Sequence, residues 1–142
     1  MRLPTSLRLL LALCVTAAPQ PLRAQGAAAP TDSAAAVAAR QLELGEQWYN
    51  SACLECHSTR ALTSPDFRLK WSGRNAFDLF ELIRSTMPDS KPGTLTQGTY
   101  AAIVAYLMKL NGIAIGTQRL SADSGALAGI RLAFPPAQST PH

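Results

Sequence analysis

The stretch Cys53-Leu54-Glu55-Cys56-His57 decides how the rest of the chain is interpreted. Two thiols separated by two residues and followed at once by a histidine form the pattern for covalent attachment of haem. Each thiol can add to one vinyl group of the porphyrin, and the histidine then lies where its imidazole can ligate the iron. The second axial ligand in a haem electron carrier is commonly a methionine thioether. Met87, about thirty residues farther on and followed by Pro88, is the candidate for that position.

The same residues allow other interpretations, because Cys-x-x-Cys also occurs in structural zinc sites, thioredoxin-like redox centres and disulfides. A structural zinc site needs four ligands, and the chain offers only Cys14 and His142 as further cysteines or histidines. A thioredoxin-like centre needs a βαβ surrounding, and no strand pattern follows His57. A disulfide between Cys53 and Cys56 would close a very small loop under strain. Haem attachment is the preferred interpretation, and a non-haem thiol–disulfide protein remains an alternative.

The composition is that of one globular domain. The chain has 142 residues, of which 47% are hydrophobic and 15% charged. Its formal net charge is +4, but Arg2, Arg8 and Arg23 lie in the first 24 residues, which contain no acidic residue. The remainder has 10 basic and 9 acidic side chains, a net charge of +1. This balance argues against nucleic-acid binding, as does the lack of any Lys/Arg cluster with interleaved aromatic residues.

Residues 1–24 have the pattern of a secretory signal peptide. A positively charged start precedes a short apolar run at residues 9–15, and the candidate cleavage sites end at Ala18 and Ala24. The apolar run is too short for a comfortable membrane span, although a retained anchor is the alternative. We therefore expect a periplasmic protein whose signal peptide, including Cys14, is removed and which keeps no stable membrane span. An exported, oxidising compartment is also where haem is attached covalently in bacteria.

The rest of the chain divides into three parts. Residues 25–37 are rich in Ala, Pro, Ser and Thr and predict a flexible linker. We expect a haem-binding domain over residues 38–116 and a C-terminal extension over residues 117–142. Within the extension, the pattern indicates a short helix at about residues 121–131 and a frayed tail from Pro135 onward.

Two amphipathic helices are expected on either side of the motif. Residues 36–51 contain no proline and place Leu42, Gly45 and Tyr49 on one face at helical spacing. A second helix is capped by Thr96 and runs to about residue 110. Its apolar stripe consists of Tyr100, Ile103, Val104 and Leu107. We expect these two helices to pack against each other.

A short segment after the motif shows a different pattern. Its apolar residues, Phe67, Leu69 and Trp71, alternate with polar residues. Alternation of this kind is typical of extended chain. We therefore expect an extended segment that ends at Gly73.

A third helix is expected at residues 75–86. Asn75 is its N-cap, and Asp78 lies three residues later, where a carboxylate suits the helix N-terminus. The helix must end before Pro88, because the residue that precedes a proline disfavours helical geometry. That residue is Met87, which is therefore released from the helix and presented on a loop.

These features together resemble a mono-haem class I c-type cytochrome domain over roughly residues 38–112. The resemblance implies an all-α fold of three to five helices wrapped around one covalently bound haem c. It also implies that the first and last helices cross closely, so that Gly45 and Tyr49 meet Tyr106. The residues that carry the resemblance are Gly45-x-x-x-Tyr49-x-x-x-Cys53-x-x-Cys56-His57, Met87-Pro88 and the final helix.

The resemblance implies a role for each site residue. Cys53 and Cys56 would hold the porphyrin, while His57 and Met87 would ligate the iron. Trp71 would pack on the haem edge, with its indole N–H toward a propionate; a core tryptophan without haem contact is the alternative. With both axial positions filled, no catalytic residue is expected.

The expected function is single-electron transfer by a carrier rather than an enzyme. The partners would be redox proteins of a respiratory chain: a dehydrogenase, a terminal oxidase or another cytochrome. The loop that contains Met87-Pro88 and Lys91-Pro92-Gly93, together with the C-terminal extension, resembles the corresponding parts of small cytochrome modules associated with PQQ-dependent alcohol and sugar dehydrogenases. The chain could therefore be a stand-alone carrier or a dehydrogenase subunit. The alternative is an open iron position, which would give a ligand-binding, sensing or peroxide-reactive protein.

Overall fold

The computed structural model describes residues 33–136, which fall within one compact unit, Thr31–His142. Residues 1–32 and 137–142 lie outside the described residues. The predicted signal peptide with Cys14, most of the predicted linker and the end of the predicted tail are among them. What falls on these residues stays a prediction, but the described end of the predicted linker, residues 34–37, is not flexible linker: it forms the first turn of the helix Ala34–Trp48.

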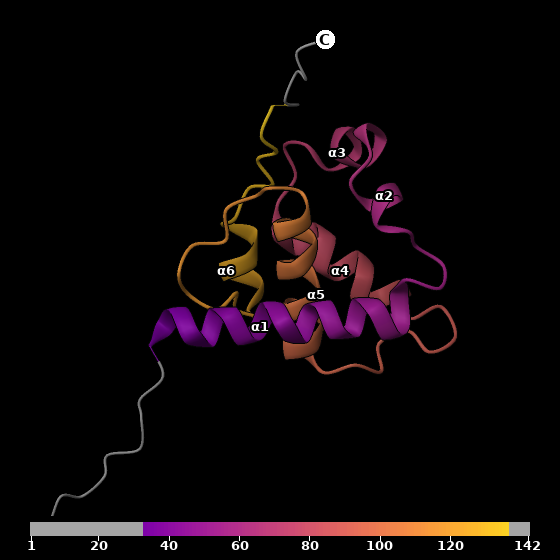
Figure 1. Ribbon diagram of the computed structural model, residues 1–142, viewed down its shortest axis with the longest axis horizontal. Coiled ribbons are helices and arrows are strands. Elements are labelled where there is room, and N and C mark those ends of the chain that lie inside the picture. The colour runs from indigo at the N-terminus through magenta and orange to yellow at the C-terminus, as the bar shows by residue number, and fades with distance from the viewer. Residues whose placement is uncertain (1–32, 137–142) are drawn as a thin grey trace, which may run out of the picture. The chain divides into compact units, whose positions relative to one another are not determined.

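The described residues form an all-α fold, as predicted, with no strand among them (Figure 1). The elements are α1 (Ala34–Trp48), the π-helical turn η1 (Tyr49–Cys53), α2 (Thr59–Leu62), α3 (Pro65–Trp71), α4 (Ala76–Thr86), α5 (Gln97–Leu110) and α6 (Ser124–Ala128). The described residues thus contain six α-helices where three to five were expected. Two of these, α2 and α6, span only 4 and 5 residues. No helix within the described residues is long and apolar enough to cross a membrane.

The helices α1 and α5 cross closely, as the resemblance implied (Figure 1). A side chain at Gly45 would overlap the carbonyl of Ala102 and would lie 2.9 Å from the Cβ of Tyr106. One turn after Gly45, the ring of Tyr49 packs against that of Tyr106 with centroids 5.5 Å apart. The glycine is therefore what lets the two backbones approach, and the prediction for this crossing is confirmed.

The last long helix, α5, is more buried than its predicted stripe suggested. Every residue from Thr99 to Met108 is buried. A helix that is apolar on all sides belongs inside a core rather than at its surface. It packs against α1 and α4, and its C-terminal end is closed by Asn111 and by Gly112, whose φ is +73°. It is the central element of the fold, around which the other helices are arranged.

The segment after α5 belongs to the same hydrophobic core. Leu120, Leu127 and Leu132 are buried in one cluster with Tyr100. The side chain of Gln41 donates to the carbonyl of Leu120 at 2.8 Å and accepts from its amide at 2.7 Å. The predicted short helix in this segment is confirmed as α6, which contacts α4. The boundary between a haem-binding domain at residues 38–116 and an extension at residues 117–142 stays a prediction.

The expectation of an extended segment ending at Gly73 is wrong, because Pro65–Trp71 form the helix α3. Ser64 caps it by accepting a hydrogen bond from the amide of Phe67, and proline stands at its first position. A capping serine followed by proline is a strong start signal for a helix. Phe67 and Trp71 then lie on one face, 6.2 Å apart, whereas Leu69 points away and is 78% exposed. The local start signal outweighed three alternating apolar residues.

Candidate functional site

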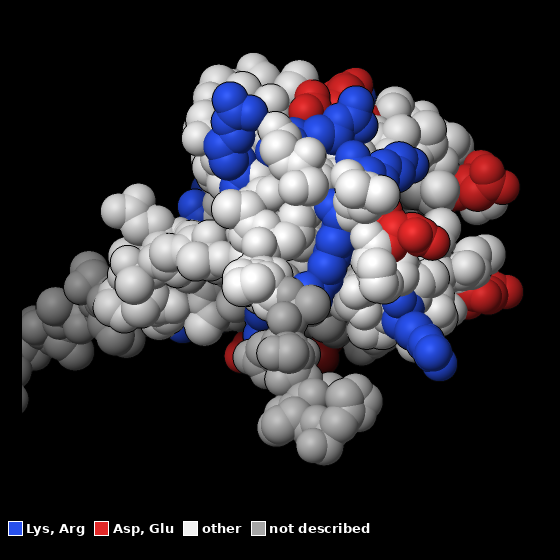
Figure 2. All heavy atoms as spheres, turned by 90° about the horizontal axis from the view of Figure 1, so that it is seen from above, with Lys and Arg blue, Asp and Glu red and all other residues white. Residues whose placement is uncertain are grey.

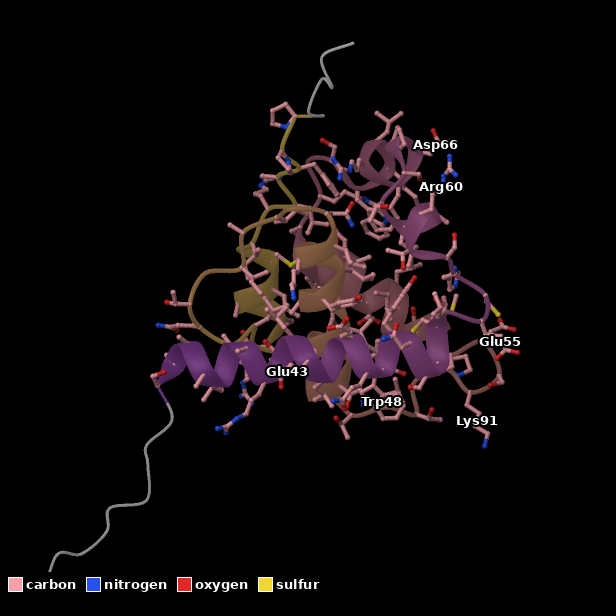
Figure 3. All side chains as sticks on the ribbon, viewed as in Figure 1. Glu43, Trp48, Glu55, Arg60, Asp66 and Lys91 are labelled. Atoms are coloured by element: carbon pink, nitrogen blue, oxygen red, sulfur yellow. The ribbon has the colours of Figure 1, made fainter. Side chains whose placement is uncertain are left out.

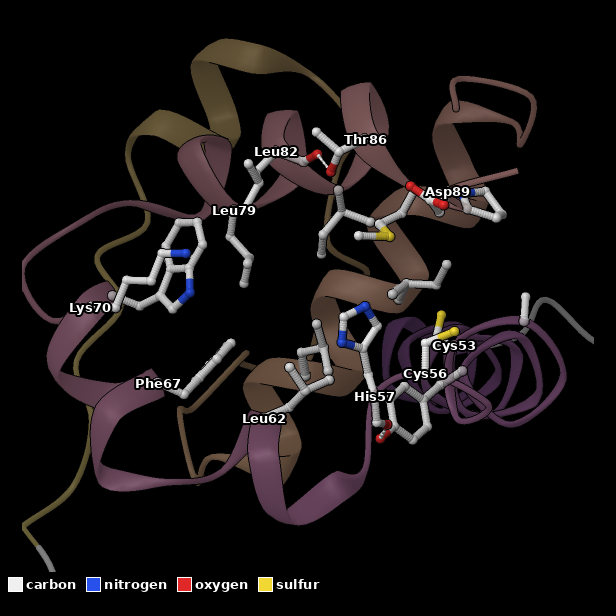
Figure 4. Close-up of a pocket in the computed structure, with 18 residues that line it drawn as sticks. Cys53, Cys56, His57, Leu62, Phe67, Lys70, Leu79, Leu82, Thr86 and Asp89 are labelled. Atoms are coloured by element: carbon white, nitrogen blue, oxygen red, sulfur yellow. Dashed lines mark hydrogen bonds between the residues drawn. The ribbon is translucent and has the colours of Figure 1, made fainter. Parts of the chain in front are cut away.

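The domain encloses a cavity of about 540 Å³ between the end of η1, the helices α2 to α5 and the loop after α4. Its lining is mainly apolar, and Leu79, Leu82 and Thr86 of α4 form part of one wall (Figure 4). All five site residues predicted from the sequence line this cavity: Cys53, Cys56, His57, Met87 and Trp71. The fold therefore gathers at one place residues that lie up to 34 positions apart.

The two thiols lie at one edge of the cavity, where α1 unwinds. The π-helical turn is closed by a hydrogen bond from the amide of Leu54 to the carbonyl of Tyr49, at 2.9 Å. The amide of His57 then donates to the carbonyl of Cys53 at 2.8 Å. Both cysteines are free thiols, Cys56 exposed and Cys53 half-buried. Burial raises the pKa of the Cys53 thiol.

His57 points its imidazole into the cavity beside Cys53 and Cys56 (Figure 4). The hydroxyl of Tyr49 donates to the main-chain carbonyl of His57 at 2.6 Å, and it lies 3.3 Å from Thr59 Oγ1. Tyr49 is itself buried at the crossing of α1 and α5. The backbone that carries the imidazole is therefore fixed to the most tightly packed part of the domain.

The cavity wall that follows His57 is tied to the end of α5 by Asn111. Its side-chain amide donates to the carbonyls of Leu62 and Leu107, both at 2.9 Å. Asn111 is buried and is the C-cap of α5. No local pattern predicts the contact with Leu62, because the two residues are 49 positions apart.

Met87 lines the same cavity and lies where α4 ends. The predicted cap of α4 is confirmed: Asn75 and Asp78 form a reciprocal capping box. Met87 has an extended backbone and its amide donates to the carbonyl of Ile83 at 2.8 Å. As predicted, it is released from the helix by Pro88, to which it is joined by a cis peptide bond. We call residues 87–95, which lead from here to α5, the methionine loop.

The methionine loop is held by a residue that sequence reasoning placed only in an apolar stripe. The hydroxyl of Tyr100 donates to the carbonyl of Met87 at 2.9 Å. It also accepts a hydrogen bond from the amide of Leu95 at 3.4 Å. The sequence offers one signal for this contact: the buried stripe has a tyrosine where a leucine or isoleucine would also fit. A buried tyrosine hydroxyl usually has a hydrogen-bond partner.

Trp71 closes the cavity at the end of α3. It is 2% exposed, and Lys70 Nζ and Arg74 Cζ lie 5.7 and 5.2 Å from its ring. Cations at this distance are attracted by the face of the indole. Lys70 also lines the cavity (Figure 4), so it places a positive charge at this end of an otherwise apolar wall.

Charges of both signs are interspersed on the surface. On the face shown in Figure 2, acidic and basic side chains alternate without a large patch of one sign. Glu55, Arg60, Asp66 and Lys91 extend outward from the half of the domain that holds the cavity (Figure 3). This arrangement agrees with the near-neutral balance of residues 25–142.

The lining has the chemistry that a covalently bound haem requires. It combines two free thiols at one edge, an imidazole and a thioether, with an apolar surface between them. Among residues 33–136, no three His, Cys, Asp or Glu side chains gather in the way that a structural zinc site would need. The residues present therefore fit a haem.

Comparison with known proteins identifies the domain. Residues 40–107 match the family model described as "Cytochrome C oxidase, cbb3-type, subunit III". No curated protein and no solved structure matches the chain. The matched range contains the motif Cys53-x-x-Cys56-His57, Met87 and most of the crossing between α1 and α5. The match supports a class I c-type cytochrome domain at residues 40–107, and a domain of this kind suggests electron transfer through haem.

Proposed function

We propose that the protein carries single electrons in the periplasm through one haem c. In this proposal Cys53 and Cys56 hold the haem covalently, and His57 and Met87 ligate its iron. The observation that supports the proposal most directly is that all four side chains line one mainly apolar cavity. When bound, the haem would supply a centre that alternates between the ferric and ferrous states.

The residues of the chain favour electron transfer over catalysis at the iron. An imidazole and a thioether would occupy both axial positions, which leaves none for a substrate. The apolar lining from Leu79, Leu82 and Phe67 would exclude water from the porphyrin faces. Trp71 would cover one edge, and Lys70 would place its ammonium where it can neutralise a propionate. The chain would thus position the iron ligands and exclude water from their surroundings.

The proposed partners are redox proteins that dock transiently. The mixed charges at the cavity side suit a small, weak interface without strong long-range steering. The matching family is described as an oxidase subunit, which supports a terminal oxidase as acceptor. The earlier likeness of the loop and extension to dehydrogenase-associated modules supports a dehydrogenase as donor, with this chain as a free carrier or bound subunit.

The test is expression of the full chain, with its leader, in a host that has intact cytochrome maturation. We expect a red periplasmic protein that keeps one haem per chain on a denaturing gel and titrates reversibly with one electron. Changing both Cys53 and Cys56 to Ser should abolish covalent retention, and each single change should weaken it. A colourless protein would overturn the proposal in favour of thiol–disulfide chemistry. Tight binding of carbon monoxide to the ferrous protein would instead favour an open iron position.

A further inference from the structure

The hydroxyl of Tyr100 lies between the two ends of the methionine loop. It donates to the carbonyl of Met87 at 2.9 Å and accepts from the amide of Leu95 at 3.4 Å. Tyr100 is in the first turn of α5 and is 0% exposed. Its ring packs edge-on against Phe80 of α4, with centroids 6.3 Å apart. The hydroxyl is thus positioned by both helices between which the loop runs.

The rest of the loop makes its contacts mainly with itself. The amide of Lys91 donates to the carbonyl of Pro88 at 2.9 Å, and Thr94 Oγ1 donates to the carbonyl of Lys91 at 2.8 Å. Residues 89–94 are exposed. These bonds give the loop its shape but do not attach it to the core. At its ends, the amide of Met87 donates to the carbonyl of Ile83 and Leu95 packs against the core. Among the described residues, Tyr100 is the side chain that hydrogen-bonds to both ends.

Opening of the loop would leave that hydroxyl without partners inside the core. An unsatisfied buried polar group costs more free energy than a formed hydrogen bond contributes. The closed loop, with Met87 against the cavity, is therefore favoured by the same two bonds that satisfy Tyr100. Tyr49 does the equivalent for His57, but its hydroxyl holds one carbonyl there and does not join the two ends of a loop.

We propose that Tyr100 is the positioning residue that keeps Met87 at the iron, by closing the methionine loop through its hydroxyl. The inference rests on the proposed function, in which Met87 is an axial ligand. Its consequence is that the strength with which Met87 resists displacement depends on this hydroxyl. A merely structural role would lower stability without changing that resistance.

The experiment uses the ferric holoprotein and added imidazole, which competes with Met87 for the iron. Tyr100→Phe keeps the ring and removes only the hydroxyl. We expect imidazole to bind this variant about tenfold more tightly than the wild type, which corresponds to about 1.4 kcal/mol. The matched control is Tyr106→Phe, the same change on the same helix, at a buried tyrosine whose hydroxyl makes no hydrogen bond within the described residues. The control should stay within about twofold of the wild type.

Variants built on Met87→Ala show whether the change in imidazole affinity depends on Met87. In Met87→Ala protein, adding Tyr100→Phe should leave imidazole affinity unchanged, because no ligand remains for the loop to hold. Equal imidazole affinities of Tyr100→Phe and Tyr106→Phe, in protein that keeps Met87, would overturn the inference. So would the same tenfold effect of Tyr100→Phe in both backgrounds. If the wild type shows no methionine ligation at all, the proposed function fails instead.

Hydrogen exchange gives an independent readout if Tyr100→Phe accumulates poorly. In wild-type holoprotein we expect slow exchange of the Leu95 amide, whose partner is the buried hydroxyl. Exchange of the Leu95 amide as fast as that of the exposed loop amides would contradict the proposed closure.

Discussion

Two residues that line the cavity, His57 and Met87, are held in the same way in different surroundings: each main-chain carbonyl accepts a hydrogen bond from a buried tyrosine. On the histidine side, the hydroxyl of Tyr49 binds the carbonyl of His57 at the crossing of α1 and α5. On the methionine side, the hydroxyl of Tyr100 donates to the carbonyl of Met87, the first residue of the methionine loop, most of which is exposed. Segments with few buried contacts open at lower free energy than packed helices. The comparison teaches that both carbonyls depend on a buried tyrosine, but only the Tyr100 hydroxyl also joins the two ends of an exposed loop.

The largest expected effect comes from breaking the packed side. A methyl group at Gly45 would overlap the carbonyl of Ala102, so Gly45→Ala must push α1 away from α5. We expect a loss of about 2 to 3 kcal/mol in the free energy of unfolding, measured by denaturant titration of the holoprotein.

The matched control for that change is Gly98→Ala. Gly98 lies in the exposed first turn of α5, where a new methyl group would approach only its neighbour Thr96, at 3.9 Å. Because alanine favours helix more than glycine, this variant should gain about 0.5 to 1 kcal/mol. Similar losses in the two variants would mean that the close crossing does not stabilise the domain.

A smaller effect is expected from removing the hydroxyl on the histidine side. Tyr49→Phe leaves the carbonyl of His57 without its donor and should cost about 1 to 2 kcal/mol of stability. Imidazole affinity should stay within about twofold of the wild type, because imidazole competes with Met87 and the methionine loop keeps both of its bonds to Tyr100. A tenfold rise, like that expected for Tyr100→Phe, would erase the difference between the two sides.

The smallest effect is expected at a surface pair on α4, the helix that leads to Met87. Arg84 makes two hydrogen bonds to Glu81, of 2.6 and 3.0 Å, and these hold the pKa of the Glu81 carboxyl below its usual value of 4.5. A carboxyl with a lowered pKa contributes stability above its unfolded pKa and loses that contribution as the pH falls through its folded pKa. Glu81→Gln should therefore be slightly less stable than the wild type at pH 7, and the difference should vanish in acid.

Thermal unfolding between pH 3 and pH 7 measures this difference. The control is Glu43→Gln, which removes one negative charge from the exposed face of α1. Since the Glu81–Arg84 pair is about 40% exposed, we expect only a small shift that weakens in salt. A difference that grows as the pH falls would contradict the sign of the pKa shift.

Local rules predicted the elements that position the site. The cap at Asn75, the break at Pro88 and the start at Thr96 all followed from neighbouring residues, and each is found in the structure. At α3 two local rules disagree: Ser64 and Pro65 indicate the start of a helix, whereas the alternation of apolar residues indicates extended chain, and the helix forms.

The contacts that hold the cavity could not be predicted in this way. Tyr100 meets Met87 across 13 residues, Asn111 meets Leu62 across 49, and Gln41 meets Leu120 across 79. Periodicity identifies such residues only as buried, because nothing local determines which distant carbonyl a side chain reaches. Tertiary packing decides those pairs, and with them the difference between the two sides.

The most direct test of the account is the absorption spectrum of the oxidised holoprotein, compared between wild type and Met87→Ala. The account predicts a methionine-sulfur-to-ferric band in the wild type that is lost in Met87→Ala, while covalent haem is retained in both. Wild-type haem without that band would contradict the claim that the methionine side supplies a ligand.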